Sequence, residues 1–130
     1  MIVISGHVVA GCGHFKERLK RANFRTAYLK ATGEKFVKGT LNVEVDRIIP
    51  INEHFRILGK DVAESEDFLL EICRIGRIWA YRIRPHHPVT GKGGHGDNCI
   101  EIICSKVIPN VDATKRTPIA ITLFRDDLCY

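Results

Sequence analysis

Residues 39–46 place the strongest restriction on how this chain can fold. A glycine is followed by strict alternation of polar and apolar residues, in which Leu41, Val43 and Val45 are the apolar members. Side chains of a β-strand point alternately to two faces, so these three residues would face a core and their polar neighbours the opposite side. We therefore expect an amphipathic strand here.

The polar face of this expected strand begins with Thr40 and Asn42. A hydroxyl and a carboxamide then lie side by side, and both supply oxygen ligands suited to a hard cation such as Mg²⁺. The alternative is that the two side chains form only the solvated face of the strand and hold no ligand. The strand pattern alone is compatible with both interpretations.

Several other segments have the β-branched and aromatic composition of strands. Pro50 restricts the segment of residues 48–51 to a sheet edge, because proline cannot donate to a hydrogen-bond ladder. Gly76 separates two segments that can pair across a turn. The further expected strands are residues 2–9, 48–51, 55–58, 68–75, 77–84, 99–104 and 118–124.

Helix formers predominate in residues 15–32, with Gly33 as the expected end and residues 23–25 as the expected break between two short helices. The turn-rich residues 85–97 predict a loop. Many short strands, one helical insertion and no alternation of strands with helices favour a mainly-β fold. We expect a small, closed β-barrel with a helical insertion after its first strand.

Composition limits the class of protein. A chain of 130 residues suits one domain spanning residues 1–130, and 27% charged with 45% hydrophobic residues is typical of a soluble globular protein. No apolar run approaches the roughly 20 residues that span a bilayer, and residues 1–6 lack the pattern of a signal peptide. We therefore expect a cytoplasmic protein that does not enter a membrane. The net charge of +5 favours anionic ligands such as nucleotides.

The chain contains five cysteines, an odd number, without a Cys-x-x-Cys pair. This usage indicates reduced thiols, most of them acting as small buried hydrophobic residues, and argues against a disulfide framework or a zinc knuckle. The histidine-rich residues 86–97 offer metal ligands without the spacing of a familiar zinc site, which favours a fortuitous cluster.

Two further features have both a functional and a structural interpretation. Gly11-Cys12-Gly13 lies before a basic helical segment, so its amides and the cations of Lys16, Arg18, Lys20 and Arg21 could cradle phosphates; the alternative is an ordinary tight turn. Glu101 interrupts an apolar strand. Its carboxylate either lies on the solvent-exposed face of the strand or is retained for proton abstraction or ligand binding.

The order of these pieces resembles the archaeal-type riboflavin kinases that use CTP, a family built on a six-stranded cradle-loop barrel. The resemblance covers roughly residues 4–105 and is carried by residues 6–13, by Gly39-Thr40-Leu41-Asn42 after a helical stretch, and by residues 100–103. The Gly-Thr-Leu-Asn sequence opening a strand is its most specific part.

By this resemblance, Thr40 and Asn42 would hold the Mg²⁺ that bridges the nucleotide phosphates. Glu101 would contact the flavin and act as general base, with His95 as a second flavin contact. The nucleotide would be bound by Gly11, Cys12, Gly13, His14, Phe15, Lys16 and Lys106. The implied reaction moves the terminal phosphate of CTP to the ribityl hydroxyl of riboflavin and yields CDP and FMN.

Two other functions remain open. The same barrel could bind a nucleotide or flavin without catalysis, as a sensor or regulatory module. Nucleic-acid binding is a weaker prediction, because the sequence shows neither a clustered basic face nor an aromatic platform. The sequence indicates no oligomeric state.

Overall fold

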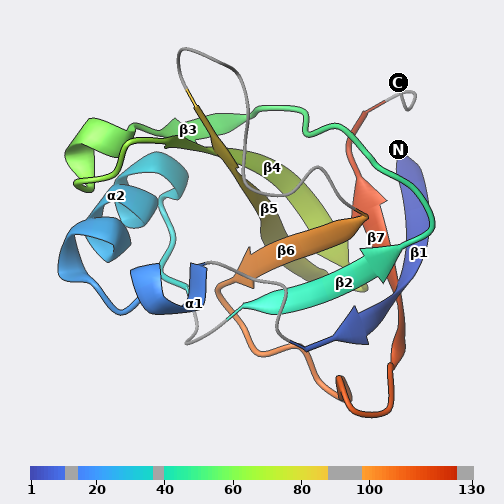
Figure 1. The fold of residues 1–130 in the computed structure, drawn as a ribbon. Coiled ribbons are helices and arrows are strands. Elements are labelled where there is room, and N and C mark those ends of the chain that lie inside the picture. Colours follow the sequence, from blue (N-terminus) through green and yellow to red (C-terminus); the bar gives the residue numbers. More distant parts are fainter. Residues whose placement is uncertain (11–14, 37–39, 88–97, 126–130) are drawn as a thin grey trace.

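The computed structural model describes residues 1–10, 15–36, 40–87 and 98–125. Its strands form one continuous antiparallel sheet, and its two α-helices follow the first strand (Figure 1). The strands are β1 (Ile2–Val9), β2 (Leu41–Val45), β3 (Phe55–Ile57), β4 (Asp67–Ile75), β5 (Ile78–His86), β6 (Cys99–Cys104) and β7 (Pro118–Leu123). The helices are α1 (Phe15–Arg18), α2 (Ala22–Thr32) and the 3-10 turn η1 (Gly59–Asp61).

Six of these strands close into a barrel. The order β4-β5-β6-β2-β1-β7 returns to its start because β7 also pairs with β4, and β3 is an extra strand. The first half of β4 pairs with β3 through Leu69 and its neighbours, whereas its second half pairs with β7 through Cys73 and Arg74. The fold is therefore mainly β, a closed six-stranded antiparallel barrel with one additional strand and helices after the first strand, as the sequence predicts.

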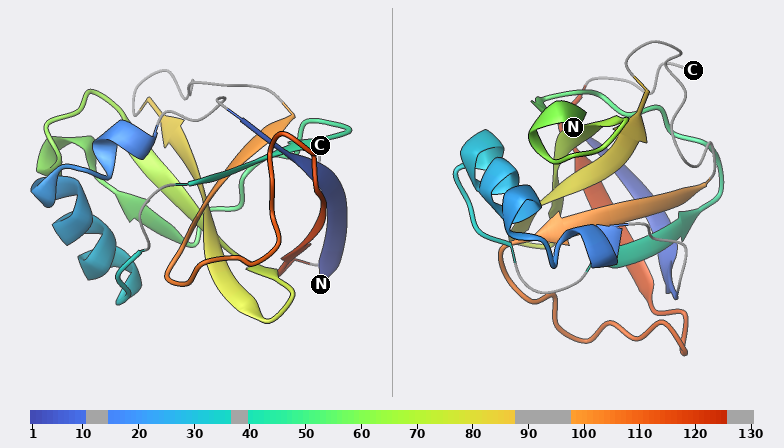
Figure 2. Two further views of the ribbon diagram at one scale, coloured as in Figure 1. Left: turned by 90° about the horizontal axis from the view of Figure 1, so that it is seen from below. Right: turned by 60° about the vertical axis from the view of Figure 1, so that its left-hand side comes forward.

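The wall of the barrel is buried on both faces at β4, β5 and β6. One apolar cluster fills the interior and includes Val43, Val45, Ile100 and Ile102. A second cluster, including Phe24, Tyr28 and Ile103, lies between the helices and the outer surface of the barrel. The helices cover one side of the barrel, away from β1 and β7 (Figure 2). The predicted inward direction of the apolar residues of β2 is confirmed.

Turn geometry supports two of the expected boundaries. Gly76, between β4 and β5, has a φ of 58°, a left-handed conformation that glycine adopts without strain, and Ile75 pairs with Ile78 across the turn. Gly33 ends α2 with a φ of 76° and donates its N–H to the Leu29 carbonyl at 2.7 Å. Both the predicted hairpin and the predicted helix end are confirmed.

The helix break lies earlier than the sequence predicts. It falls at residues 19–21, where Arg21 has the extended φ and ψ of −86° and 134°, and α2 begins at Ala22. The expected break at residues 23–25 is wrong because Phe24 is fully buried against Phe15 and Phe68. This aromatic packing holds Phe24 on the inner face of α2.

Residues 48–51 are not a strand, which corrects a second expectation. The carbonyl oxygens of Ile49 and Pro50 instead accept hydrogen bonds from the guanidinium of Arg82, and Arg125 also donates to Pro50 at 2.9 Å. Side chains therefore satisfy backbone groups that a strand would give to its neighbours.

The cysteines follow the sequence-based expectation only in part. Cys73 and Cys104 are free and buried, as predicted. Burial raises the pKa of the Cys73 thiol to about 12, so this group is protonated at neutral pH. Cys99, in contrast, is disulfide-bonded, and the expectation of reduced thiols is wrong for it. Cys12 and Cys129 lie outside the described residues.

Candidate functional site

The predicted site is centred on a hydrogen bond between two strands. The Thr40 hydroxyl donates to Glu101 Oε2 at 3.0 Å, although 61 positions separate the residues. The same oxygen accepts the backbone N–H of Phe15 at 3.2 Å. The start of β2, the middle of β6 and the first residue of α1 therefore meet at one carboxylate.

Strand register explains why these groups converge. Asn42 is the direct cross-strand partner of Glu101, and residues directly opposite each other present their side chains on the same face. This face is the outer one, because Val43 and Ile100 point into the interior cluster. The period of two then brings Thr40 to the same face as Asn42. The structure thus brings together the three residues Thr40, Asn42 and Glu101.

Asn42 has an unusual environment. Its Oδ1 atom is buried and has no hydrogen-bond partner among the described residues. A buried carbonyl oxygen without a partner loses its bonds to water and gains none in exchange. The atom lies beside a hydroxyl and a carboxylate, which together are the oxygen ligands that Mg²⁺ prefers. The donor set therefore fits this cation.

A different class of metal site finds less support. Within the described ranges, no group of three or more histidine, cysteine, aspartate or glutamate residues is placed to hold a metal ion. Most of the histidine-rich segment, including His95, lies outside these ranges. A divalent ion at the Thr40 end of the barrel would therefore depend on hydroxyl and amide oxygens as well as on the carboxylate of Glu101.

Glu101 is buried, with 7% of its surface exposed. A buried carboxylate is costly unless hydrogen bonds compensate for lost hydration, and the donors from Thr40 and Phe15 do so. The bond from the Phe15 N–H also attaches α1 to the barrel wall. The carboxylate thus has a structural role in this conformation, and a chemical role would use the same oxygen atoms.

The residues predicted to bind the nucleotide are placed only in part. Gly11, Cys12, Gly13 and His14 lie outside the described residues. Phe15 packs its ring edge-on against Phe68 and is buried, so only its backbone is available near the site. Lys16 lies in α1. Lys106 is exposed, two positions after β6 ends, and no contact joins it to Glu101 in the part of the chain that the structure describes.

The basic residues of α1 and the following turn differ from the expected phosphate cradle. Arg18 and Arg21 both pair with Glu64, at 2.9 and 2.7 Å. Lys20 pairs with Glu17 at 3.2 Å. The guanidinium of Arg18 also lies over the rings of Phe15 and Phe68 at 5.3 Å each. These cations are engaged within the protein, which reduces the charge that they could offer to a ligand.

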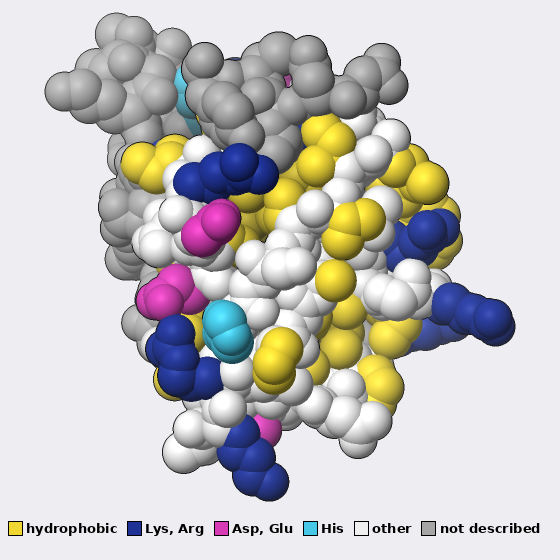
Figure 3. Space-filling model, turned by 90° about the vertical axis from the view of Figure 1, so that its right-hand side faces the viewer, with side chains coloured by type: hydrophobic (Ala, Val, Ile, Leu, Met, Phe, Trp, Pro, Cys, Tyr) yellow, Lys and Arg dark blue, Asp and Glu magenta, His cyan; other side chains and the backbone are white. Residues whose placement is uncertain are grey.

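Space near Glu101 is narrow. A pocket of about 20 Å³ is lined by Glu101, Phe15 and Arg84, among others. Larger hollows lie elsewhere. One hollow of about 640 Å³ is an open groove over β1, β2 and β7. Figure 3 shows the side of the barrel where β1 and β7 lie, on which apolar and uncharged side chains lie between charged ones. Another, of about 490 Å³, lies between α2 and Arg56.

Two participants in this region were missed by sequence reasoning. The backbone N–H of Phe15 carries no sequence signal, because any non-proline residue would supply it. Arg84, in contrast, had a recognisable sequence signal. It and Arg82 alternate with apolar or aromatic residues in a largely buried strand. Arginine at two successive positions of one buried face is unusual and could have been identified as a candidate.

Comparisons with known proteins do not assign the chain to a family. No protein-family model matches it, and a search of curated proteins finds no match. In the described part of the chain, every helix is too short or too polar to cross a lipid bilayer.

Proposed function

We propose that this protein is a magnesium-dependent kinase that transfers the terminal phosphate of a nucleoside triphosphate, CTP in the first instance, to the ribityl 5′-hydroxyl of riboflavin. The observation that carries the proposal is the meeting of Thr40, Asn42 and Glu101 on one face, with the Asn42 oxygen buried and unpartnered among the described residues. The resemblance to the CTP-using family in residues 39–43 supplies the substrate class.

Thr40 and Asn42 would hold the magnesium ion. When bound, the ion would neutralise phosphate charge and align the phosphates for transfer. Asn42 offers its amide oxygen without giving up an existing hydrogen bond. Thr40 offers its hydroxyl oxygen, whose proton already points to Glu101. The two residues are thus suited to this role by their present hydrogen bonding.

Glu101 would act on the flavin. A carboxylate within reach of the ribityl hydroxyl can accept its proton as the oxygen attacks phosphorus, or orient the hydroxyl by a hydrogen bond. Because Glu101 Oε2 already accepts two hydrogen bonds, its orientation is fixed before a ligand arrives. Phosphoryl transfer depends mainly on positioning and charge neutralisation, to which such fixed groups contribute directly.

A second candidate function is a non-catalytic module that binds a nucleotide or a flavin. One observation favours it: the carboxylate of Glu101 is used to join α1 to the barrel, and the adjoining pocket measures only about 20 Å³. In that case Thr40 and Glu101 would form a structural contact, and ligand binding would proceed without turnover.

The decisive experiment incubates the purified protein with riboflavin and Mg²⁺ and with CTP, ATP, GTP or UTP in parallel. We expect FMN to form, fastest with CTP, and to be lost when EDTA removes the metal. Absence of FMN with all four nucleotides would reject the kinase proposal. Tight binding of riboflavin or CTP without FMN would then support the binding module.

A further inference from the structure

The outer surface of the barrel carries an aromatic pair built from two distant parts of the chain. Trp79 lies at the start of β5, and Phe124 follows the end of β7. Their rings are stacked, with centroids 5.1 Å apart and an interplanar angle of 28°. Strand β4 lies between β5 and β7 and pairs with both, so the two rings meet across it. Ala80, the neighbour of Trp79, belongs to the interior cluster, so Trp79 points outward.

The indole of Trp79 keeps much of its surface free. The guanidinium carbon of Arg74 lies 5.4 Å from the Trp79 centroid and 5.6 Å from the Phe124 centroid. Because the two rings are 5.1 Å apart, the three groups form a nearly equilateral triangle, and Arg74 cannot lie on the indole face opposite Phe124. Trp79 is 51% exposed, and no other ring or cation of the described residues lies against it. The side of the indole turned away from Phe124 is thus open to a ligand.

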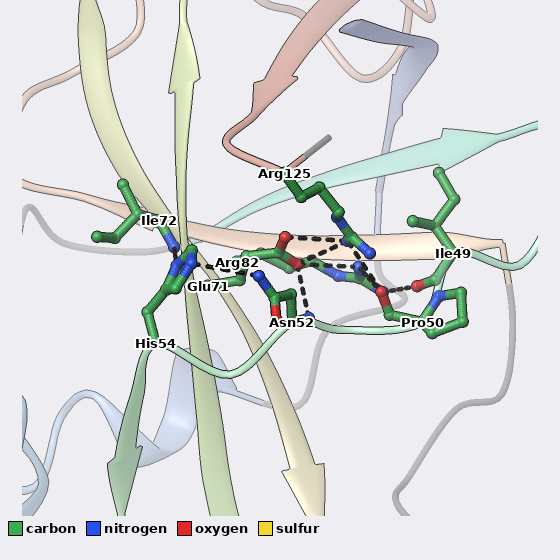
Figure 4. Close-up of polar contacts among 8 residues, drawn as sticks. All are labelled: Ile49, Pro50, Asn52, His54, Glu71, Ile72, Arg82 and Arg125. Atoms are coloured by element: carbon green, nitrogen blue, oxygen red, sulfur yellow. Dashed lines mark hydrogen bonds and ion pairs between the residues drawn. The ribbon is translucent and has the colours of Figure 1, made fainter. Parts of the chain in front are cut away.

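The residue after Phe124 fixes this arrangement. Arg125 turns away from the rings, pairs with Glu71 Oε2 at 2.9 Å and donates to the Pro50 carbonyl at 2.9 Å (Figure 4). Glu71 is fully buried, so this contact anchors the chain directly after β7. Phe124 is therefore held beside Trp79 before any ligand arrives, which lowers the entropic cost of binding.

The surroundings of the pair carry positive charge. Arg74 touches both rings, Arg77 is exposed in the turn two positions before Trp79, and Lys106 is exposed two positions after β6, whose last residue lies opposite Ala80. None of these three cations forms an ion pair with a carboxylate of the described residues. No aspartate or glutamate occurs in the segments that carry or flank the pair, residues 1–5, 72–81, 102–107 and 118–125.

One carboxylate does reach these strands from outside. Glu34, which follows α2, accepts a hydrogen bond from the Tyr81 hydroxyl at 2.8 Å. Tyr81 belongs to the cluster under the helices, so this contact lies toward the helix-covered side. Asp126 and Asp127 come next after Arg125 in the sequence and lie outside the described residues.

An exposed indole with cations around it matches the chemistry of an unpaired nucleotide strand. Bases stack on aromatic rings whatever their identity, and arginine and lysine bind the phosphates between them. The hollows of about 640, 490 and 20 Å³ are lined by other residues, so this surface suits a flat ring and not a side chain that needs a pocket. An acidic peptide would satisfy the cations but would not use the indole.

We propose that Trp79, supported by Phe124, is a base-stacking platform for a single-stranded nucleic acid whose phosphates bind Arg77 and Lys106. The sequence gives no sign of this platform, because its two rings come from strands that are far apart in the chain. The proposal does not rest on the kinase reaction, which uses Thr40, Asn42 and Glu101. The two can therefore stand or fail separately.

The first test uses the intrinsic fluorescence of Trp79, the only tryptophan of the chain. The full chain is titrated at low salt with oligo(dT) and oligo(U) of about 10 nucleotides, with an abasic strand of equal length and with a duplex. We expect both single strands with bases to quench the emission. The abasic strand should bind more weakly, because it offers phosphates alone, and so should the duplex, whose bases are already stacked with each other.

The second test measures anisotropy of a labelled oligo(dT) with variants. Trp79→Ala should raise Kd by about 5- to 150-fold, the range measured for loss of one stacked base, and Trp79→Phe should raise it less. Arg77→Gln should reduce the slope of log K against log salt concentration by about 0.7. Lys60→Gln is the matched control, because Lys60 is exposed in η1, next to α2, and it should change neither quantity.

Four results would overturn the proposal. They are absence of binding at low salt, equal affinity for the abasic strand, equally tight binding of polyglutamate, and a wild-type Trp79 emission that shifts with protein concentration as dimers form. The last two would assign the surface to an acidic partner or to a second copy of the chain. If Trp79→Ala fails to fold by circular dichroism, the comparison of oligo(dT) with the abasic strand on the wild type decides. Trp79→Ala should leave any FMN formation unchanged, which keeps this test separate from that of the kinase.

Discussion

The Thr40 hydroxyl donates to the Glu101 carboxylate at 3.0 Å across the outer face of β2 and β6. This contact connects a residue predicted to bind a metal with a residue predicted to act on the flavin. It also fixes the rotamers of both side chains before any ligand binds. A change at either position should therefore alter the other, and the variants below separate loss of chemistry from loss of structure.

Thr40→Val removes the hydroxyl and keeps the shape of the side chain. We expect loss of FMN formation and a decrease in the free energy of unfolding of about 1.5–3 kcal/mol, because one hydrogen bond to a buried carboxylate is lost. Thr40→Ser keeps the hydroxyl and should retain activity. Urea unfolding and the FMN assay measure the two effects. Full activity in Thr40→Val would contradict the assigned role.

Asn42→Leu should separate stability from function. The Asn42 Oδ1 atom is buried without a partner among the described residues, so replacing the amide by an apolar group of similar size should stabilise the fold by about 1 kcal/mol. The same variant should lose Mg²⁺-dependent activity. Differential scanning calorimetry with and without Mg²⁺ tests the first part. A clearly destabilised variant would show that the amide has a structural partner.

Glu101→Gln keeps an acceptor oxygen for the Phe15 N–H and removes the charge. We expect a folded protein in which FMN formation is slower by about 100-fold or more, the range that a positioned general base contributes. Glu101→Ala should instead destabilise the attachment of α1, seen as faster amide exchange in residues 15–18. Equal turnover by wild type and Glu101→Gln would limit Glu101 to a structural role.

Glu71→Leu should strongly destabilise the barrel. It leaves the buried guanidinium of Arg82 without its carboxylate, and breaking a buried pair in this way costs about 3–5 kcal/mol. Combining it with Arg82→Met should recover part of the loss, since two apolar side chains can replace such a pair. Chemical denaturation of the single and double variants measures the coupling. Additive losses in the double variant would exclude an interaction between the two residues.

Alkaline pH should reveal the contact between Tyr81 and Glu34. The Tyr81 hydroxyl donates to Glu34 Oε2 at 2.8 Å, and burial together with this bond raises the pKa of Tyr81 to about 12, above the ordinary value of 10.0. The folded state then keeps a proton that the unfolded state loses. The contribution of this proton to the free energy of unfolding is complete below pH 10. It falls by up to about 1.4 kcal/mol per pH unit as the pH rises to 12. Tyr81→Phe should show a shallower decrease in unfolding free energy between pH 10 and 12.

The regular elements could be predicted because local patterns determine them. Alternation around Val43 identified β2, and Gly76 identified the turn between β4 and β5. Residues 48–51 were misassigned because the partners of Ile49 and Pro50 are side chains from distant strands. The same limitation hid the disulfide of Cys99, since pairing of cysteines depends on distance in space and not on spacing in the sequence.

The residues of the candidate site could be predicted from the sequence, but the contacts that surround them could not. The period of two places Thr40 and Asn42 on one face, and Glu101 was identified because it interrupts an apolar strand. The cross-strand register that joins these residues depends on how β2 and β6 pair, which no short segment determines. Pairing of Arg18 and Arg21 with Glu64 likewise depends on the packing of the helices against the turn around η1.

The position of β7 has a consequence for biosynthesis. This strand lies between β1 and β4, with Ile2 opposite Leu123 and Cys73 also opposite Leu123. Until residues 118–123 leave the ribosome, the nascent chain holds two strands with unsatisfied amide and carbonyl edges. Such edges can pair with other chains and cause aggregation. Chaperones that bind the nascent chain would therefore be most important in this interval.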